Sequence, residues 1–229
     1  MKKLLLITLV SSFILVSCSK DDDDPVPTPG TDKYMTSTVG STWNYSYTDD
    51  NDPSNNDTYT VTSINKDTSA NAKSYHVFTN SGSDNEYYNI TGNDYYTLQA
   101  FSLAGTDTIL ENLYLKDNAA LNFGWLQTYT VDVSGTDIEV RLTNKIEEKG
   151  ITKTVGSTVY TNVIHIVTTI DIPILVTLPG SSLSTDIHYY YAPKVGLIQN
   201  DSKIDLVAPL LTLDEHTDVH TILQSATIL

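Results

Sequence analysis

Apolar and polar residues alternate in short runs along most of the chain. From Thr42 to Thr48 the aromatic residues Trp43, Tyr45 and Tyr47 alternate with polar ones, so the three rings share one face of a strand. Similar runs follow at 58–64, 73–79, 86–90, 94–100, 108–115, 125–133, 137–147, 158–172, 186–191, 196–200, 203–207 and 217–222. Runs of this length between turn residues are typical of an antiparallel all-β domain.

The segments between the runs contain turn residues and almost no helical signal. Links through Gly92 and Gly135 predict hairpins, and Pro173 ends the run 158–172, which we expect to be a long central strand. One short helical turn is expected between 117 and 124. A sheet of more than ten strands with little helix to cover it must bury its apolar face and protect its two edge strands. We therefore predict a large, curved antiparallel sheet that forms a barrel, a half-barrel or a sandwich.

Composition supports this prediction and excludes one class of partner. Threonine, tyrosine, valine and isoleucine are abundant, which favours strands over helices. The chain has 28 acidic and 13 basic residues, a net charge of −15. With Arg141 as the sole arginine and no basic cluster, the sequence lacks the positive surface that nucleic-acid binding requires.

Residues 1–17 have the layout of an export signal. Lys2 and Lys3 precede an apolar run that is shorter than the ~20 residues needed to span a bilayer. Removal of these two lysines leaves 11 basic and 28 acidic residues, a net charge of −17. Cys18 is the only cysteine, so no intramolecular disulfide can form. The Asp- and Pro-rich residues 18–33 predict an extended tether, and residues 34–229 a single all-β domain.

The motif Leu15-Val16-Ser17-Cys18 resembles the lipobox of bacterial lipoproteins. The resemblance implies cleavage before Cys18 and attachment of fatty-acyl chains such as palmitate to this residue, which would anchor the protein to a membrane. The run from Ser19 to Asp24 resembles the acidic export signal of surface-exposed lipoproteins of Bacteroidota. This implies the outer membrane, with the protein facing the cell exterior. The alternative is a solvated charge run that has no sorting role.

A late segment carries a second resemblance. His188-Tyr-Tyr-Tyr-Ala-Pro-Lys-Val-Gly-Leu-Ile198, together with residues 155–163 and Trp43, is similar to sequences of uncharacterised all-β lipoproteins of Bacteroidota. In such proteins the segment joins two late strands of a curved sheet. Their architecture is related to that of lipoprotein carriers with an open half-barrel. This chain departs from those carriers because it lacks a predicted helix to fill the concavity.

The candidate metal ligands do not have the spacing of a known site. His216 and His220 are separated by Thr-Asp-Val, without the glutamate of a zinc-protease helix, and on a strand they would lie about 13 Å apart. The oxygen-rich loop 49–57 offers calcium ligands but not EF-hand spacing, so we expect a solvated turn. No nucleophile elbow or phosphate loop is present, and no pair of carboxylates stands out. We expect no metal, no cofactor and no catalysis.

Adjacent tyrosines are the enrichment that points to binding. In a strand one ring of each pair faces the core and the other faces outward, and Tyr88, Tyr96 and Tyr190 are the candidates for the outward rings. They could equally be cross-strand pairs that stabilise a wide sheet. The leading hypothesis is a non-catalytic binding or scaffolding module that recognises a glycan or a surface protein. The alternative is a carrier of a lipid or other hydrophobic ligand, and the third hypothesis is a hydrolase.

Overall fold

The computed structural model describes residues 33–103, 106–133 and 135–229, which belong to one compact unit, Asp32–Leu229. The predicted signal peptide, Cys18 and the acidic run lie outside the described residues, so their roles stay predictions. Within the described part of the chain, no helix has the length and apolar character needed to cross a membrane.

Twelve strands make up the described part of the unit, which confirms the predicted all-β fold with more than ten strands. They are β1 (Thr42–Asp49), β2 (Asp57–Ala70), β3 (Lys73–Asn80), β4 (Glu86–Thr91), β5 (Asp94–Leu103), β6 (Thr106–Lys116), β7 (Gly124–Val133), β8 (Thr136–Val155), β9 (Thr158–Asp171), β10 (Ser182–Ala192), β11 (Gly196–Ala208) and β12 (Leu213–Thr227). The short 3-10 helices η1 (Pro53–Asn55), η2 (Pro173–Thr177) and η3 (Pro209–Leu211) follow β1, β9 and β11.

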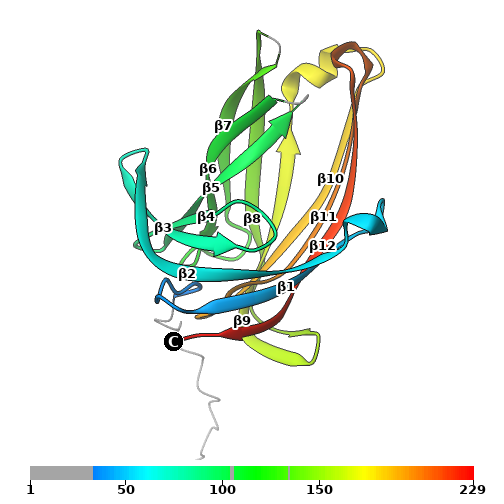
Figure 1. Ribbon diagram of the computed structural model, residues 1–229. Helices are drawn as coiled ribbons and strands as arrows, with labels where there is room; N and C mark the ends of the chain where they lie inside the picture. The colour runs from blue at the N-terminus through cyan, green and yellow to red at the C-terminus, as the bar shows by residue number, and fades with distance from the viewer. Residues whose placement is uncertain (1–32, 104–105, 134) are drawn as a thin grey trace, which may run out of the picture. The chain divides into compact units, whose positions relative to one another are not determined.

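All twelve strands belong to one antiparallel sheet in the order β6-β5-β4-β3-β2-β1-β12-β11-β10-β9-β8-β7. The first and last strands therefore pair at its centre, with Thr42 opposite Thr227. The sheet curves into a nearly closed barrel, and β6 and β7 are its two edges (Figure 1). These edge strands are consecutive in the sequence.

Side chains of β7 close the gap between the two edges. The Gln127 side chain accepts a hydrogen bond from Leu113 N at 3.1 Å and donates one to Glu111 O at 3.3 Å. Trp125 Nε1 donates to Leu113 O at 2.7 Å, and the Tyr129 hydroxyl donates to Glu111 O at 2.8 Å. These three side chains are two residues apart, so they share one face of β7. They satisfy backbone groups that an edge strand would otherwise expose.

Several sequence-based boundaries need correction. The runs 196–200 and 203–207 form the single strand β11, because the polar residues between them pair with β12. The β-branched run 158–172 is β9, which lies third from the β7 edge and not at the centre of the sheet. Residues 117–123 form turns without a helix. Pro173 ends the preceding strand as expected, and η2 begins there.

The segment that enters the first strand packs against one end of the barrel. Lys33 O accepts a hydrogen bond from Lys194 N at 2.6 Å, and Tyr34 N donates to the Tyr95 hydroxyl at 2.9 Å. Met35 packs against the buried aromatic clusters of this end. The opposite end is filled by an aliphatic cluster that includes Val131, Val140, Ile172, Leu175, Leu206 and Leu213. The space that remains lies between these two packed regions.

Candidate functional site

A cavity of about 620 Å³ lies inside the barrel. Its walls carry six tyrosines, Tyr45, Tyr59, Tyr88, Tyr114, Tyr189 and Tyr191, together with aliphatic side chains from β8, β9 and β11. Binding pockets for small molecules are typically ~300–1,000 Å³ and mostly apolar, with a few polar groups that orient the ligand. The cavity has the size of such a pocket.

The aromatic rings on one side of the cavity form a continuous wall. Phe78, which is fully buried and does not itself line the cavity, contacts Trp43 and Tyr88, with ring centroids 5.6 Å and 5.2 Å apart. Tyr114 continues the wall, with centroids 5.9 Å from Tyr88 and 5.4 Å from Tyr191. These residues come from β1, β3, β4, β6 and β10, so the wall depends on the closure of the sheet. Burial raises the pKa values of Tyr88, Tyr114 and Tyr191 well above the ordinary value, so these phenols stay neutral.

Glu86 places a carboxylate on this wall. It precedes Tyr88 by two residues on β4, so both side chains point to the same face, and both line the cavity. The carboxylate accepts hydrogen bonds from Asn80 Nδ2 and from the Tyr88 hydroxyl, each at 2.7 Å. Both donors are neutral, so neither offsets the negative charge.

Asn112 adds an acceptor that has no partner. Its side chain is 9% exposed and lines the cavity, and its Oδ1 atom forms no hydrogen bond within the described part of the chain. Strand register places Asn112 beside Thr97, which in turn lies beside Tyr88. An unsatisfied buried polar atom is costly, and most such atoms in folded proteins are paired. A donor group on a ligand would satisfy it.

The cavity reaches solvent on one side. Among the residues that line it, Ser83, Asp84 and Asn85 in the turn between β3 and β4 are exposed, as are Gln99 and Ala100 on β5. These five residues therefore mark the mouth of the cavity. A ligand that entered here would pass the β3–β4 turn before it met the aromatic wall.

The three tyrosines singled out from the sequence do not form one face. Tyr88 lies inside the barrel on the cavity wall, which corrects the expectation that it faces outward. Tyr96 lies on β5 with the Lys73 ammonium 4.1 Å from its ring centroid. Tyr190, on the face of β10 opposite to Tyr189 and Tyr191, stacks on His165 with a centroid distance of 4.3 Å. The alternation predicted one inward ring per pair, and the choice of Tyr88 as the outward ring of its pair was wrong.

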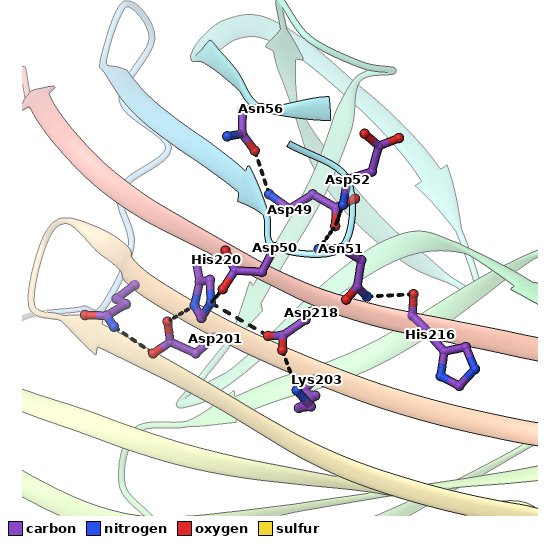
Figure 2. A network of polar contacts seen from close by, with 11 residues as sticks. Asp49, Asp50, Asn51, Asp52, Asn56, Asp201, Lys203, His216, Asp218 and His220 are labelled. Atoms are coloured by element: carbon purple, nitrogen blue, oxygen red, sulfur yellow. Dashed lines mark hydrogen bonds and ion pairs between the residues drawn. The ribbon is translucent and has the colours of Figure 1, made fainter. Parts of the chain in front are cut away.

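Two candidate metal motifs were considered, the oxygen-rich loop 49–57 and the segment from His216 to His220. Asp50 of the loop lies close to Asp218 and His220 of the segment (Figure 2). His220 Nε2 lies 3.6 Å from Asp50 Oδ2 and 3.7 Å from Asp218 Oδ1, and its Nδ1 lies 2.8 Å from Asp201 Oδ1. Asp50, Asp218 and His220 offer a set of ligand atoms that could hold a metal ion. The hydrogen bond to Asp201 contributes most to a raised pKa of His220, followed by the charges around it. The carboxylates around His220 therefore favour the protonated form of its ring.

His216 belongs to a different group from His220. Its two ring nitrogens contact Asp205 and Asp214 at 2.9 Å and 3.0 Å. The oxygen-rich loop after β1 is held by its own side chains, since Asp49 Oδ1 accepts from Asn51 N and Asp52 N. The loop is therefore a turn that is held by hydrogen bonds within itself.

A chain of two histidines and two carboxylates escaped the sequence analysis. His165 contacts Glu148 at 2.9 Å and His188 at 2.8 Å, and His188 contacts Asp186 at 2.7 Å. Burial lowers the pKa of His165, against the influence of Glu148. None of these four residues lines the cavity. The chain is therefore separate from the candidate binding site.

Comparisons with known proteins add little to this picture. No family model matches the chain, and no curated protein matches it. Among solved structures, the chain is similar to a crystal structure from Parabacteroides distasonis, described as a "putative lipoprotein", with a TM-score of 0.46 and 9% sequence identity. The alignment covers 86% of this chain and 99% of that chain. At this score and identity, the likeness carries no argument about what the protein binds.

Proposed function

We propose that the protein is a non-catalytic binding protein that holds a small, largely apolar ligand inside its barrel. The observation that carries this proposal is a cavity of about 620 Å³ with an aromatic wall and an unpartnered buried acceptor on Asn112. Protein cores are close-packed, and a void of this size lowers stability because the side chains around it lose van der Waals contacts, so a cavity that is kept indicates a binding role. The proposal develops the carrier hypothesis from the sequence.

The expected location is the outer membrane, with an acyl anchor on Cys18. This part of the proposal rests on the sequence motif alone. An anchored binding protein would keep its ligand close to the membrane, which suits a molecule of low solubility in water. Recognition of a glycan or a surface protein by outward tyrosines is less well supported, because Tyr96 and Tyr190 lie on different strands and are each covered by another side chain.

Binding of a neutral fluorescent probe, N-phenyl-1-naphthylamine, tests the proposal. Ala100 is an exposed residue at the mouth, so Ala100→Trp should narrow the entrance and weaken binding about ten-fold or more, equivalent to ~1.4 kcal/mol. Ala120→Trp is the matched control, because Ala120 is also exposed but does not line the cavity. Mass spectrometry of organic extracts of the purified protein would then identify a natural ligand.

Two results would count against a binding cavity. One is wild-type protein that leaves the probe unbound after any natural ligand has been extracted. The other is equal binding by the two tryptophan variants, which would place the probe elsewhere on the surface.

A further inference from the structure

The charged groups of the cavity all have the same sign. Among the described residues, the carboxylates of Asp84 at the mouth and Glu86 inside line it, and no lysine, arginine or histidine does. A ligand with a buried carboxylate or phosphate would therefore meet no positive charge and would lie near Glu86 in a poorly hydrated space. Burial of two like charges together is strongly unfavourable.

The position of Glu86 suits the binding of a positive charge. Its two hydrogen bonds come from the neutral side chains of Asn80 and Tyr88. Burial is the main cause of the raised pKa values of Tyr45, Tyr88 and Tyr59, the last to about 12, and charge repulsion by Glu86 is the second cause. The carboxylate therefore lies within electrostatic reach of several rings of the cavity wall. Tyrosine rings have a negative face that attracts cations, most strongly where water is excluded.

Asn112 offers a second polar contact to a ligand whose charged group lies at Glu86. Its free Oδ1 is an acceptor and needs a donor. The row Tyr88, Thr97, Asn112 runs across β4, β5 and β6, so Asn112 lies two strands from the strand of Glu86. Two strand spacings are about 10 Å, so a donor on the body of the ligand could reach Asn112 while the amine lies at Glu86.

We propose that the cavity selects a protonated amine on an apolar body over neutral or anionic molecules of the same size. This inference rests on the proposed function, since it names the class of ligand that the cavity takes. Glu86 supplies the counter-charge, the tyrosine wall supplies cation–π and apolar contacts, and Asn112 accepts a further hydrogen bond. Asp84 at the mouth attracts the cation as it approaches.

Probes that differ only in their head group test the proposal. Dodecylamine, dodecan-1-ol and dodecanoate compete with N-phenyl-1-naphthylamine for the purified protein, below the concentration at which each probe aggregates. The amine should bind about ten-fold more tightly than the alcohol, and dodecanoate should bind most weakly. Equal affinities for amine and alcohol would overturn this inference but leave the proposed function intact. Failure of all three probes to displace the dye would contradict the proposed function itself.

Two variants with the same change in net charge separate Glu86 from the general acidity of the chain. Glu86→Gln keeps the shape of the side chain and should abolish the preference for the amine while alcohol binding stays within about three-fold. Asp84→Asn, at the exposed mouth, should reduce amine affinity only slightly, and added salt should remove that difference. Equal loss of amine binding in both variants would assign the preference to surface charge and refute a role for Glu86.

Discussion

Replacement of Gln127 by leucine tests whether side chains hold the two edges of the sheet together. Leucine keeps most of the volume but removes the hydrogen bonds to Leu113 N and Glu111 O. Glu111 O keeps its bond from Tyr129, so only the Leu113 amide loses its partner. A lost hydrogen bond costs about 1 kcal/mol and an orphaned, partly buried donor about 1–3 kcal/mol. We therefore expect the free energy of unfolding to fall by about 2 kcal/mol.

Urea denaturation measures this loss. For a slope near ~2 kcal/mol per molar urea, a change of about 2 kcal/mol lowers the midpoint by about 1 M. Gln99→Leu is the matched control: Gln99 is exposed, so its variant should stay within about 0.5 kcal/mol of wild type. Hydrogen exchange should become faster at the Leu113 amide in Gln127→Leu. An unchanged midpoint and an unchanged Leu113 amide would show that other contacts hold the edges together.

Three further predictions concern other parts of the molecule. The pKa of His220 is raised above its ordinary value of 6.5 in the folded state, so the stabilisation is complete below pH 6.5 and is lost as the pH rises through the raised value. In thermal melts, the advantage of wild type over His220→Gln should therefore shrink as the pH rises above 6.5. Gly196 has a φ of +91°, and an added Cβ would lie 3.4 Å from Tyr34 O, so Gly196→Ala should lower the free energy of unfolding by about 2 kcal/mol in urea denaturation. Gly150→Ala is the control, because Gly150 also has a positive φ but open space around it, and its loss should be about 1 kcal/mol. Cys18→Ala should abolish metabolic labelling with a fatty-acid analogue and release the protein from the membrane fraction; labelling that persists would refute the anchor.

The sequence predicted the class of fold because its signal is local. Alternation around Trp43 and Tyr45, together with turn residues at regular intervals, was sufficient to predict an antiparallel sheet of more than ten strands. The pairing of β1 with β12 has no local signal. The prediction of two runs in place of β11 is wrong because the polar residues Asp201 and Ser202 do not interrupt the strand, and Asp201 pairs with His220 on the neighbouring strand.

The candidate site was harder to predict, because it depends on which face of each strand turns inward. Tyr88 was expected on the outside, but closure of the sheet places its face inside. The signal that could have found Glu86 and Asn112 is their spacing, since each lies two residues before a tyrosine of the cavity wall, Tyr88 or Tyr114. A polar residue two positions from a tyrosine on the same strand lies on the same face as the aromatic ring, and is therefore a candidate site residue.

The pairing of β1 with β12 makes the order of synthesis important for this protein. The two halves of the sheet, β1–β6 and β7–β12, can each form hairpins as the ribosome produces them. The pairing of β1 with β12, which joins the halves, can form only after β12 has been synthesised. Until then, the strand that carries Trp43 has an unpaired side, which is a known route to aggregation. A nascent chain that stops short of Leu213 would therefore remain open along its middle.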